Sequence, residues 1–156
     1  EWMSEKTGRT WRVPTEQEWT ALCTSSGVTP ETLDDHAWHK DNSKRRTHEL
    51  GTKKPDAHGL HDLHGNVGEW CTAVEDGWVL LGGHFRDRSE ACTCTMRRTP
   101  VPEWNDTDPQ IPKSIWWLSD APFAGFRVVC ESAPDSSDAS RTPGPPTSPS
   151  EGAPGS

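Results

Sequence analysis

The chain has 156 residues, of which 30% are hydrophobic, and it carries a formal net charge of -8 at pH 7. This length is that of about one domain, and the acidic balance argues against a nucleic-acid or anionic-membrane surface, because phosphate binding depends on clustered Lys and Arg. No apolar run approaches the roughly 18 to 20 residues of a membrane span, so we expect neither a membrane span nor a nucleic-acid partner.

Two short helices are predicted near the start of the chain. Charged residues surround Trp2 and Met3, and Gly8 is placed to end a first helix. Thr15 and Glu18 form a capping box, in which a hydroxyl and a carboxylate satisfy the free amides of a helix start. We therefore expect a second helix over about residues 15–24.

The middle and the end of the chain are predicted to be poor in regular structure. Residues 25–58 are polar and without periodicity, so they should form long ordered loops, which are usually functional or organised by a ligand. Short strands are expected near residues 78–81, 92–96 and 125–129, where β-favouring residues lie between turn signals. Five prolines between Pro100 and Pro122 argue against regular sheet there.

Tryptophan dominates the aromatic content, with nine Trp and no Tyr. Each indole buries on the order of 200 Å², so Trp is predicted to supply much of the core, with an aromatic binding cleft as the alternative. Trp116 and Trp117 are exceptions, because their loop setting favours exposure.

The segment Gly59 to Cys71, GLHDLHGNVGEWC, combines a turn signal with two acids. The Gly65-Asn66 pair tolerates positive φ, so the chain can fold back and bring the carboxylates of Asp62 and Glu69 together with free carbonyls. Calcium takes roughly six to eight oxygen ligands of these kinds. The sequence therefore predicts either a calcium site or a turn with solvated acids.

His58, His61 and His64 recur at every third position, a weak sign of a zinc or iron site. Zinc needs three or four converging donors. Only a tight helix would align this triplet, and Gly59 and Gly65 argue against one. We therefore expect structural roles for the three histidines.

Four ordered motifs resemble the formylglycine-generating enzyme family, also called sulfatase-modifying factor domains. The segment Gly59 to Cys71 is similar to the family hallmark Gly-Leu-x-Asp-x-x-Gly-Asn-Val-x-Glu-Trp. The other three motifs are RVPTEQEW at residues 12–19, VLLGGH at residues 79–84 and GFRVV at residues 125–129. The resemblance implies an α+β, C-type-lectin-like fold with short strands, few helices and long ordered loops.

The resemblance also implies a domain organisation and a calcium site. Residues 1–131 would be the C-terminal portion of a family domain whose N-terminal part is missing. Many relatives are parts of multidomain bacterial proteins. Residues 132–156, rich in Ser, Pro and Gly, would be a disordered tail. The calcium ligands implied are Asp62, the carbonyls of Gly65 and Val67, and Glu69.

Catalysis in the resembled enzymes depends on two cysteines that hold copper(I), and this sequence departs from that pattern. The second family cysteine falls on Cys92, but the first falls on Asp87. Two thiolates suit copper(I), whereas a carboxylate with one thiolate does not. Cys94 could act with Cys92 as a substitute pair, since alternate strand residues share a face. The alternative, implied by the family disulfide, is that Cys94 or Cys92 pairs with Cys23, which would fit an extracytoplasmic location.

We therefore expect a binding or accessory module rather than an enzyme, stabilised by calcium, with a protein, peptide or small-molecule ligand in the old active-site cleft. The cleft residues expected are His84, Asp87, Arg97, Trp116 and Trp117, with Trp104 beside them. The alternative is a copper-dependent oxidase of the formylglycine-generating type that acts on a protein or small-molecule thiol through Cys92 and Cys94.

Overall fold

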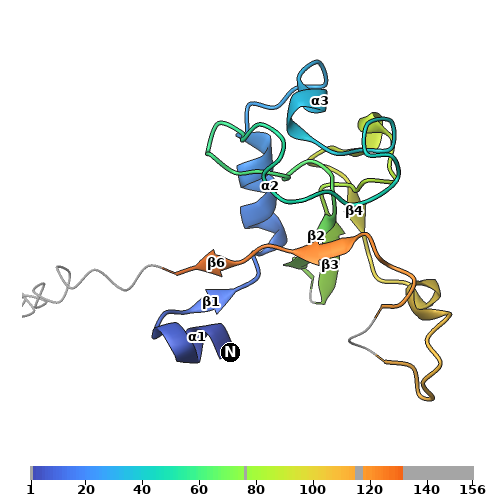
Figure 1. The fold of residues 1–156 in the computed structure, drawn as a ribbon. Helices are drawn as coiled ribbons and strands as arrows, with labels where there is room; N and C mark the ends of the chain where they lie inside the picture. The colour runs from blue at the N-terminus through green and yellow to red at the C-terminus, as the bar shows by residue number, and fades with distance from the viewer. Residues whose placement is uncertain (1, 76, 115–117, 132–156) are drawn as a thin grey trace, which may run out of the picture.

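The computed structural model describes residues 2–75, 77–114 and 118–131. Trp116, Trp117 and the predicted tail from residue 132 therefore lie outside the described residues. The chain runs through short helices and strands separated by long loops (Figure 1). The elements in order are α1 (Trp2–Thr7), β1 (Trp11–Arg12), α2 (Glu16–Thr24), α3 (Leu33–His36), β2 (Gly68–Thr72), β3 (Trp78–Leu81), η1 (Ser89–Ala91), β4 (Arg97–Arg98), η2 (Pro102–Asn105), β5 (Ala124–Phe126) and β6 (Val129–Cys130).

Both predicted helices are confirmed, and local chemistry sets their ends. The amide of Gly8, at φ +65°, donates to the Ser4 carbonyl at 2.9 Å and closes α1. At α2 the Glu18 amide donates to the Thr15 hydroxyl at 3.2 Å, while the Thr15 amide donates to the Glu18 carboxylate at 2.8 Å. This reciprocal pair is the predicted capping box.

The main sheet has the strand order β4-β3-β2-β5. Strands β2 and β3 form an antiparallel hairpin with Glu69 opposite Leu81, and β5 lies parallel to β2 with Gly125 opposite Glu69. A separate two-stranded ribbon joins β1 to β6. The prediction of a strand near residues 125–129 is thus confirmed as two shorter strands.

The strand predicted at residues 92–96 is wrong. This segment forms turns, and the sheet pairing begins only at Arg97. Cys92 is buried against a second small cluster, whereas Cys94 is bonded to Cys23 on α2. The burial of Cys92 and the disulfide of Cys94 fix the backbone in a conformation that does not pair with a neighbouring strand.

The core lies between α2 and the hairpin of β2 and β3. Its buried members are Trp19, Cys23, Leu63, Cys71, Val79 and Leu81. The prediction of a tryptophan-rich core is wrong in extent, because among the described tryptophans only Trp19 is fully buried, while Trp2 and Trp78 are 69% and 53% exposed. Aliphatic residues and cysteines fill the space instead.

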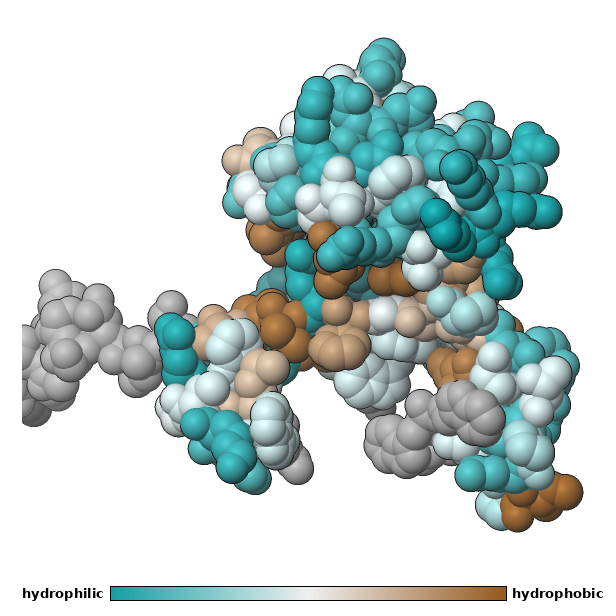
Figure 2. Space-filling view, viewed as in Figure 1, coloured by the Kyte–Doolittle hydropathy of each residue, from teal (hydrophilic) through white to brown (hydrophobic). Residues whose placement is uncertain are grey.

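Polar loops between α2 and β2 cover the upper end of the sheet, and the space-filling view shows this part as mostly hydrophilic (Figure 2). Among the described residues, every helix is too short or too polar to cross a lipid bilayer. The fold is α+β, with long ordered loops that carry the candidate sites.

Candidate functional site

The turn that precedes β2 is fixed by backbone conformations that few residues adopt. Asp62, Gly65 and Asn66 have φ values of +58°, +117° and +59°. A Cβ on Gly65 would lie 2.5 Å from the Trp38 carbonyl oxygen, so only glycine fits there. The Asn66 amide donates to that same carbonyl at 2.7 Å, and its side chain accepts from the His48 amide at 2.9 Å. The predicted fold-back is confirmed, together with its glycine requirement.

Glu69 is buried at the start of β2 and accepts three hydrogen bonds. Arg127 donates to one carboxylate oxygen from Nη2 at 2.7 Å and to the other from Nε at 2.9 Å. Trp19 donates to the second oxygen from Nε1 at 2.8 Å. The carboxylate therefore ties α2, β2 and the exit of β5 together, a role for Arg127 that the sequence alone did not indicate.

One buried carboxylate oxygen of Asp62 lacks a hydrogen-bond donor among the described residues. Its Oδ2 accepts from the Gly51 amide at 2.9 Å, while Oδ1 is buried without a hydrogen-bond partner among the described residues. Asp62, Val67, Glu69 and Arg127 line one hollow of about 390 Å³. A buried carboxylate oxygen without a donor can be satisfied by a cation or by water.

Two of the predicted cleft residues, His84 and Asp87, lie together, and both side chains are largely buried. The Asp87 carboxylate accepts from the His84 amide at 3.0 Å, and its Oδ2 lies 3.4 Å from His84 Nε2. Nδ1 of His84 accepts from the Arg86 amide at 3.1 Å. Burial lowers the pKa of His84 to about 4, so the ring is neutral at pH 7.

The prediction that Arg97 belongs to this cleft is wrong. Arg97 points to Glu16 on α2, with Nε 2.7 Å from the carboxylate. The neighbouring Arg98 takes its place and donates to Asp87 Oδ1 at 2.7 Å. Adjacent residues of a strand point to opposite faces, so a shift of one residue exchanges the two partners.

Four aromatic rings, beginning with His84, contact one another in sequence. His84 stacks on Phe123 with centroids 4.4 Å apart, Phe123 meets Trp104 edge to face at 5.4 Å, and Trp104 is tilted against Trp70 at 5.9 Å. We call these four residues the aromatic row. Trp70, Trp104 and Phe123 are each half-buried. Phe123 was missed from the sequence, although it directly precedes β5; Trp116 and Trp117 lie outside the described residues.

The cysteines are arranged as a disulfide and three free thiols. Cys23 and Cys94 are bridged, which confirms one of the two disulfide alternatives, while Cys71, Cys92 and Cys130 are free. The predicted Cys92 and Cys94 thiol pair is therefore wrong, because the sulfur of Cys94 is held by Cys23. Burial, with a further contribution from Asp87, raises the pKa of Cys92 to about 12.

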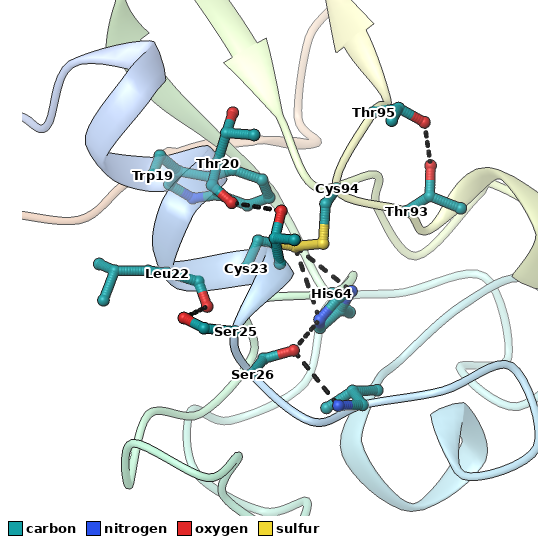
Figure 3. The surroundings of a disulfide bond; sticks show 12 residues. Trp19, Thr20, Leu22, Cys23, Ser25, Ser26, His64, Thr93, Cys94 and Thr95 are labelled. Carbon is teal, nitrogen blue, oxygen red and sulfur yellow. Dashed lines mark hydrogen bonds between the residues drawn. A yellow bond between two sulfur atoms is a disulfide. The ribbon is translucent and has the colours of Figure 1, made fainter.

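The three regularly spaced histidines do not meet. The ring of His58 lies 2.8 Å from the Ser25 hydroxyl, and that of His61 lies 2.9 Å from the Lys53 carbonyl. His64 is buried beside the Cys23–Cys94 bridge and contacts Ser26 (Figure 3). Burial lowers the pKa of His64, and hydrogen bonding to the Cys92 backbone opposes that shift.

Comparison with known proteins gives one family and two informative solved structures. Residues 1–131 match the model of the sulfatase-modifying factor enzyme 1-like domain. Treponema denticola variable protein 1 is 26% identical with a TM-score of 0.59, over 78% of this chain and 48% of that chain. PvdO from Pseudomonas aeruginosa is 23% identical with a TM-score of 0.62, over 83% of this chain and 56% of that chain.

The chain thus spans about half the length of these two solved relatives. No curated protein sequence matches it.

Proposed function

Because this chain belongs to the family of sulfatase-modifying factor enzyme 1-like domains, we propose that it uses the family scaffold as a calcium-stabilised binding module rather than as a copper oxidase. The fold is that of the formylglycine-generating enzymes. The proposed module binds a peptide or a small molecule beside the aromatic row.

The arrangement of the thiols is the observation that carries the proposal. Copper(I) favours soft thiolate ligands. Asp87, at the position of one family cysteine, is paired with Arg98, and Cys94 is bridged to Cys23. Cys92 is left as a single buried thiol with a pKa of about 12, so it is protonated at pH 7. This donor set favours a function without the oxidase chemistry.

Calcium fits the turn through Asp62. Its Oδ1 is buried without a partner, and none of the described donors reaches the carbonyls of Gly65 or Val67. A carboxylate offers about four lone-pair sites, and Glu69 uses three of them for Arg127 and Trp19. One site remains for a cation. When bound, calcium would supply positive charge and fix these oxygens in one arrangement.

Arg127 sets a limit on that calcium site. Two carboxylates and one guanidinium leave a local charge of about -1, and sites with little ligand charge bind calcium at about 10⁻⁴ to 10⁻³ M. We therefore propose a structural calcium ion of low affinity, held by Asp62, Gly65, Val67 and Glu69.

The aromatic row supports the binding part of the proposal. Three half-buried rings lie in contact with one another and with the buried, neutral ring of His84. Aromatic side chains give a large contact area at little cost in conformational entropy. Asp87 and Arg98 add a polar end beside His84. A ligand with an apolar or aromatic group and a polar neighbour matches this arrangement.

An activity assay tests the proposal against the oxidase alternative. The purified protein is incubated with copper(I), oxygen and a Cys-x-Pro-x-Arg peptide, and the products are examined by mass spectrometry. We expect unmodified peptide. Formylglycine from the wild type, and its loss in Cys92→Ser, would reject the module and establish the oxidase.

A binding experiment tests the aromatic row directly. A randomised peptide library is selected on the wild type, and the enriched peptides are measured by fluorescence anisotropy. The double variant Trp104→Ala/Phe123→Ala should weaken binding by more than about tenfold, since each aromatic contact contributes on the order of 1 kcal/mol. Trp78→Ala, at an exposed tryptophan of β3, should bind like the wild type. Equal losses in both variants would place the ligand elsewhere.

A further inference from the structure

Three potential metal ligands meet where α2 faces the loop before β4. Cys23 lies on α2, His64 lies in the turn before β2, and Cys94 precedes β4 (Figure 3). The two sulfurs and a ring nitrogen of His64 lie within 4.8 Å of one another. Cys23 is 1% exposed and His64 is 5% exposed, so these two donors are shielded from competing solvent, while Cys94 is half-buried.

The separation of sulfur and nitrogen is that of tetrahedral zinc, but the His64 ring must turn to direct one nitrogen lone pair at the ion, because Cys23 Sγ is almost equally distant from both nitrogens. Cys23 Sγ lies 3.7 Å from Nδ1 and 3.6 Å from Nε2 of His64. Zinc bonds of about 2.3 Å to sulfur and about 2.1 Å to nitrogen place the two donors about 3.6 Å apart in a tetrahedron. The two sulfurs would stand about 3.8 Å apart around the same ion. Two reduced thiols in contact have a similar separation, so opening the bridge already creates the required space.

The surroundings supply the remaining features of a metal site. The Ser26 hydroxyl lies 3.1 Å from Nε2 of His64, and the backbone of Cys92 also hydrogen-bonds the ring. One of these two partners must be released for a ring nitrogen to bind zinc, and the other then orients the ligating ring. A hollow of about 560 Å³ is lined by His64, Cys92 and Cys94. It gives an ion a path to the donors and leaves room for water as the fourth ligand.

We propose that reduction of the Cys23–Cys94 bridge creates a zinc site formed by the two thiolates and His64. A dithiol supplies the two electrons and two protons that open the bridge, and it becomes a disulfide itself. Zinc then displaces both thiol protons to solvent and binds the two sulfurs, the imidazole and one water. In the oxidised protein the sulfurs have no thiolate to offer, so the same site is closed to zinc.

This site is chemically distinct from the turn around Asp62. Thiolate and imidazole ligands select zinc and other soft or borderline ions, whereas carboxylates and carbonyls select calcium. Excess calcium therefore does not compete with zinc for Cys23 and Cys94. The zinc site adds a redox-dependent ligand to the module and does not depend on its proposed peptide ligand.

Zinc titration of the full chain in both redox states tests the proposal. The protein is reduced with a phosphine under anaerobic conditions, excess calcium is present, and zinc is added against a chromophoric chelator. We expect one zinc per reduced chain and none per oxidised chain. Cobalt(II) at the same site should give the absorption bands of tetrahedral thiolate coordination. A reduced chain that binds no zinc would overturn the proposal.

Matched histidine variants identify the nitrogen ligand. Loss of an outer partner costs about 10- to 100-fold in affinity, so loss of the ligand itself in His64→Asn should cost more than about 100-fold. His58→Asn, at an exposed histidine, should bind zinc like the wild type. Equal affinity of His64→Asn and the wild type would reject the site.

Unfolding of the reduced chain does not remove the test. If reduction alone abolishes the near-ultraviolet circular dichroism, zinc should restore it, since metal binding contributes directly to folding. Failure of zinc either to bind or to restore the signal would refute the proposal.

Discussion

Arg127 donates hydrogen bonds to both carboxylate oxygens of Glu69, at 2.7 and 2.9 Å, although the two residues are 58 positions apart in the sequence. Glu69 begins the central hairpin and Arg127 follows β5, so this pair fastens the last part of the fold to the first strand of the main sheet. The Glu69 side chain is 6% exposed and that of Arg127 is 23% exposed. Breaking such a pair leaves a buried charge without its partner.

We predict that Arg127→Ala lowers the free energy of unfolding by about 3 kcal/mol, because the buried carboxylate of Glu69 then keeps only Trp19 as a donor. Urea titration measures the loss. Arg97→Ala is the matched control, since it breaks a more exposed pair with Glu16 and should cost less than about 1 kcal/mol. Similar losses of unfolding free energy in the two variants would show that the Glu69–Arg127 pair contributes no more to stability than an exposed pair.

Calcium should raise the melting temperature of the wild type. At ten times the dissociation constant, a ligand stabilises the folded state by about 1.4 kcal/mol, which corresponds to a rise of about 4 °C. Asp62→Asn should abolish the response, because Oδ1 loses its charge. Asp41→Asn, at an exposed aspartate, should retain it. A wild-type melting curve that a chelator leaves unchanged would exclude the site.

Asp62 is a better probe of calcium than Glu69. Glu69→Gln should blunt the calcium response as well, but it also weakens the pair with Arg127 and the bond from Trp19. A lower melting temperature in that variant therefore has two causes. The comparison of Asp62→Asn with and without calcium isolates the effect of calcium binding.

Removal of the disulfide should destabilise the domain strongly. The bridge closes a loop with a sequence separation of 71, for which loop-closure entropy gives about 4 kcal/mol. Cys23→Ser/Cys94→Ser should therefore show a much lower urea midpoint than Cys130→Ser, which changes a free thiol. Equal midpoints in metal-free buffer would contradict a stabilising bridge.

Stability should fall in mild acid because of His84. Its pKa is about 4 in the folded chain, lowered mainly by burial, against an ordinary value of 6.5. The unfolded chain therefore binds the proton first, and stability that is complete above pH 6.5 is lost as the pH falls towards 4. The loss from this group is up to about 3 kcal/mol.

His84→Asn should flatten the dependence of unfolding free energy on pH between 7 and 4, measured by urea titration at each pH. Asp87 favours protonation of the ring, while Arg86 and Arg98 oppose it. His58→Asn should keep the slope of the wild type. An unchanged slope in His84→Asn would assign the acid sensitivity to other groups.

Local signals in the sequence predicted local structure well. The capping box at Thr15 and the turn at Gly65 both depend on residues within a few positions of each other, and both are confirmed. The family motifs likewise predicted the fold class. These features need no knowledge of which distant segments meet.

Two predictions that depend on distant partners failed. Arg97 and Arg98 are adjacent residues of the same type, so the sequence alone does not distinguish them. Only the pairing of β4 with β3 decides which of the two faces Asp87. A shift of one residue moves a strand side chain to the other face. The path of residues 92–96 was misjudged for the same reason, since the bridge to Cys23 is a tertiary constraint.

The parallel pairing of β5 with β2 has a consequence for the order of folding. The hairpin of β2 and β3 closes between neighbours in sequence, whereas β5 must return from more than fifty residues away to lie beside β2. Contacts of high sequence separation form slowly, because the chain entropy is lost before the contact is made. We expect the hairpin to form early and the Glu69–Arg127 ion pair to form last, so the turn around Asp62 reaches its final arrangement only when nearly the whole domain is in place.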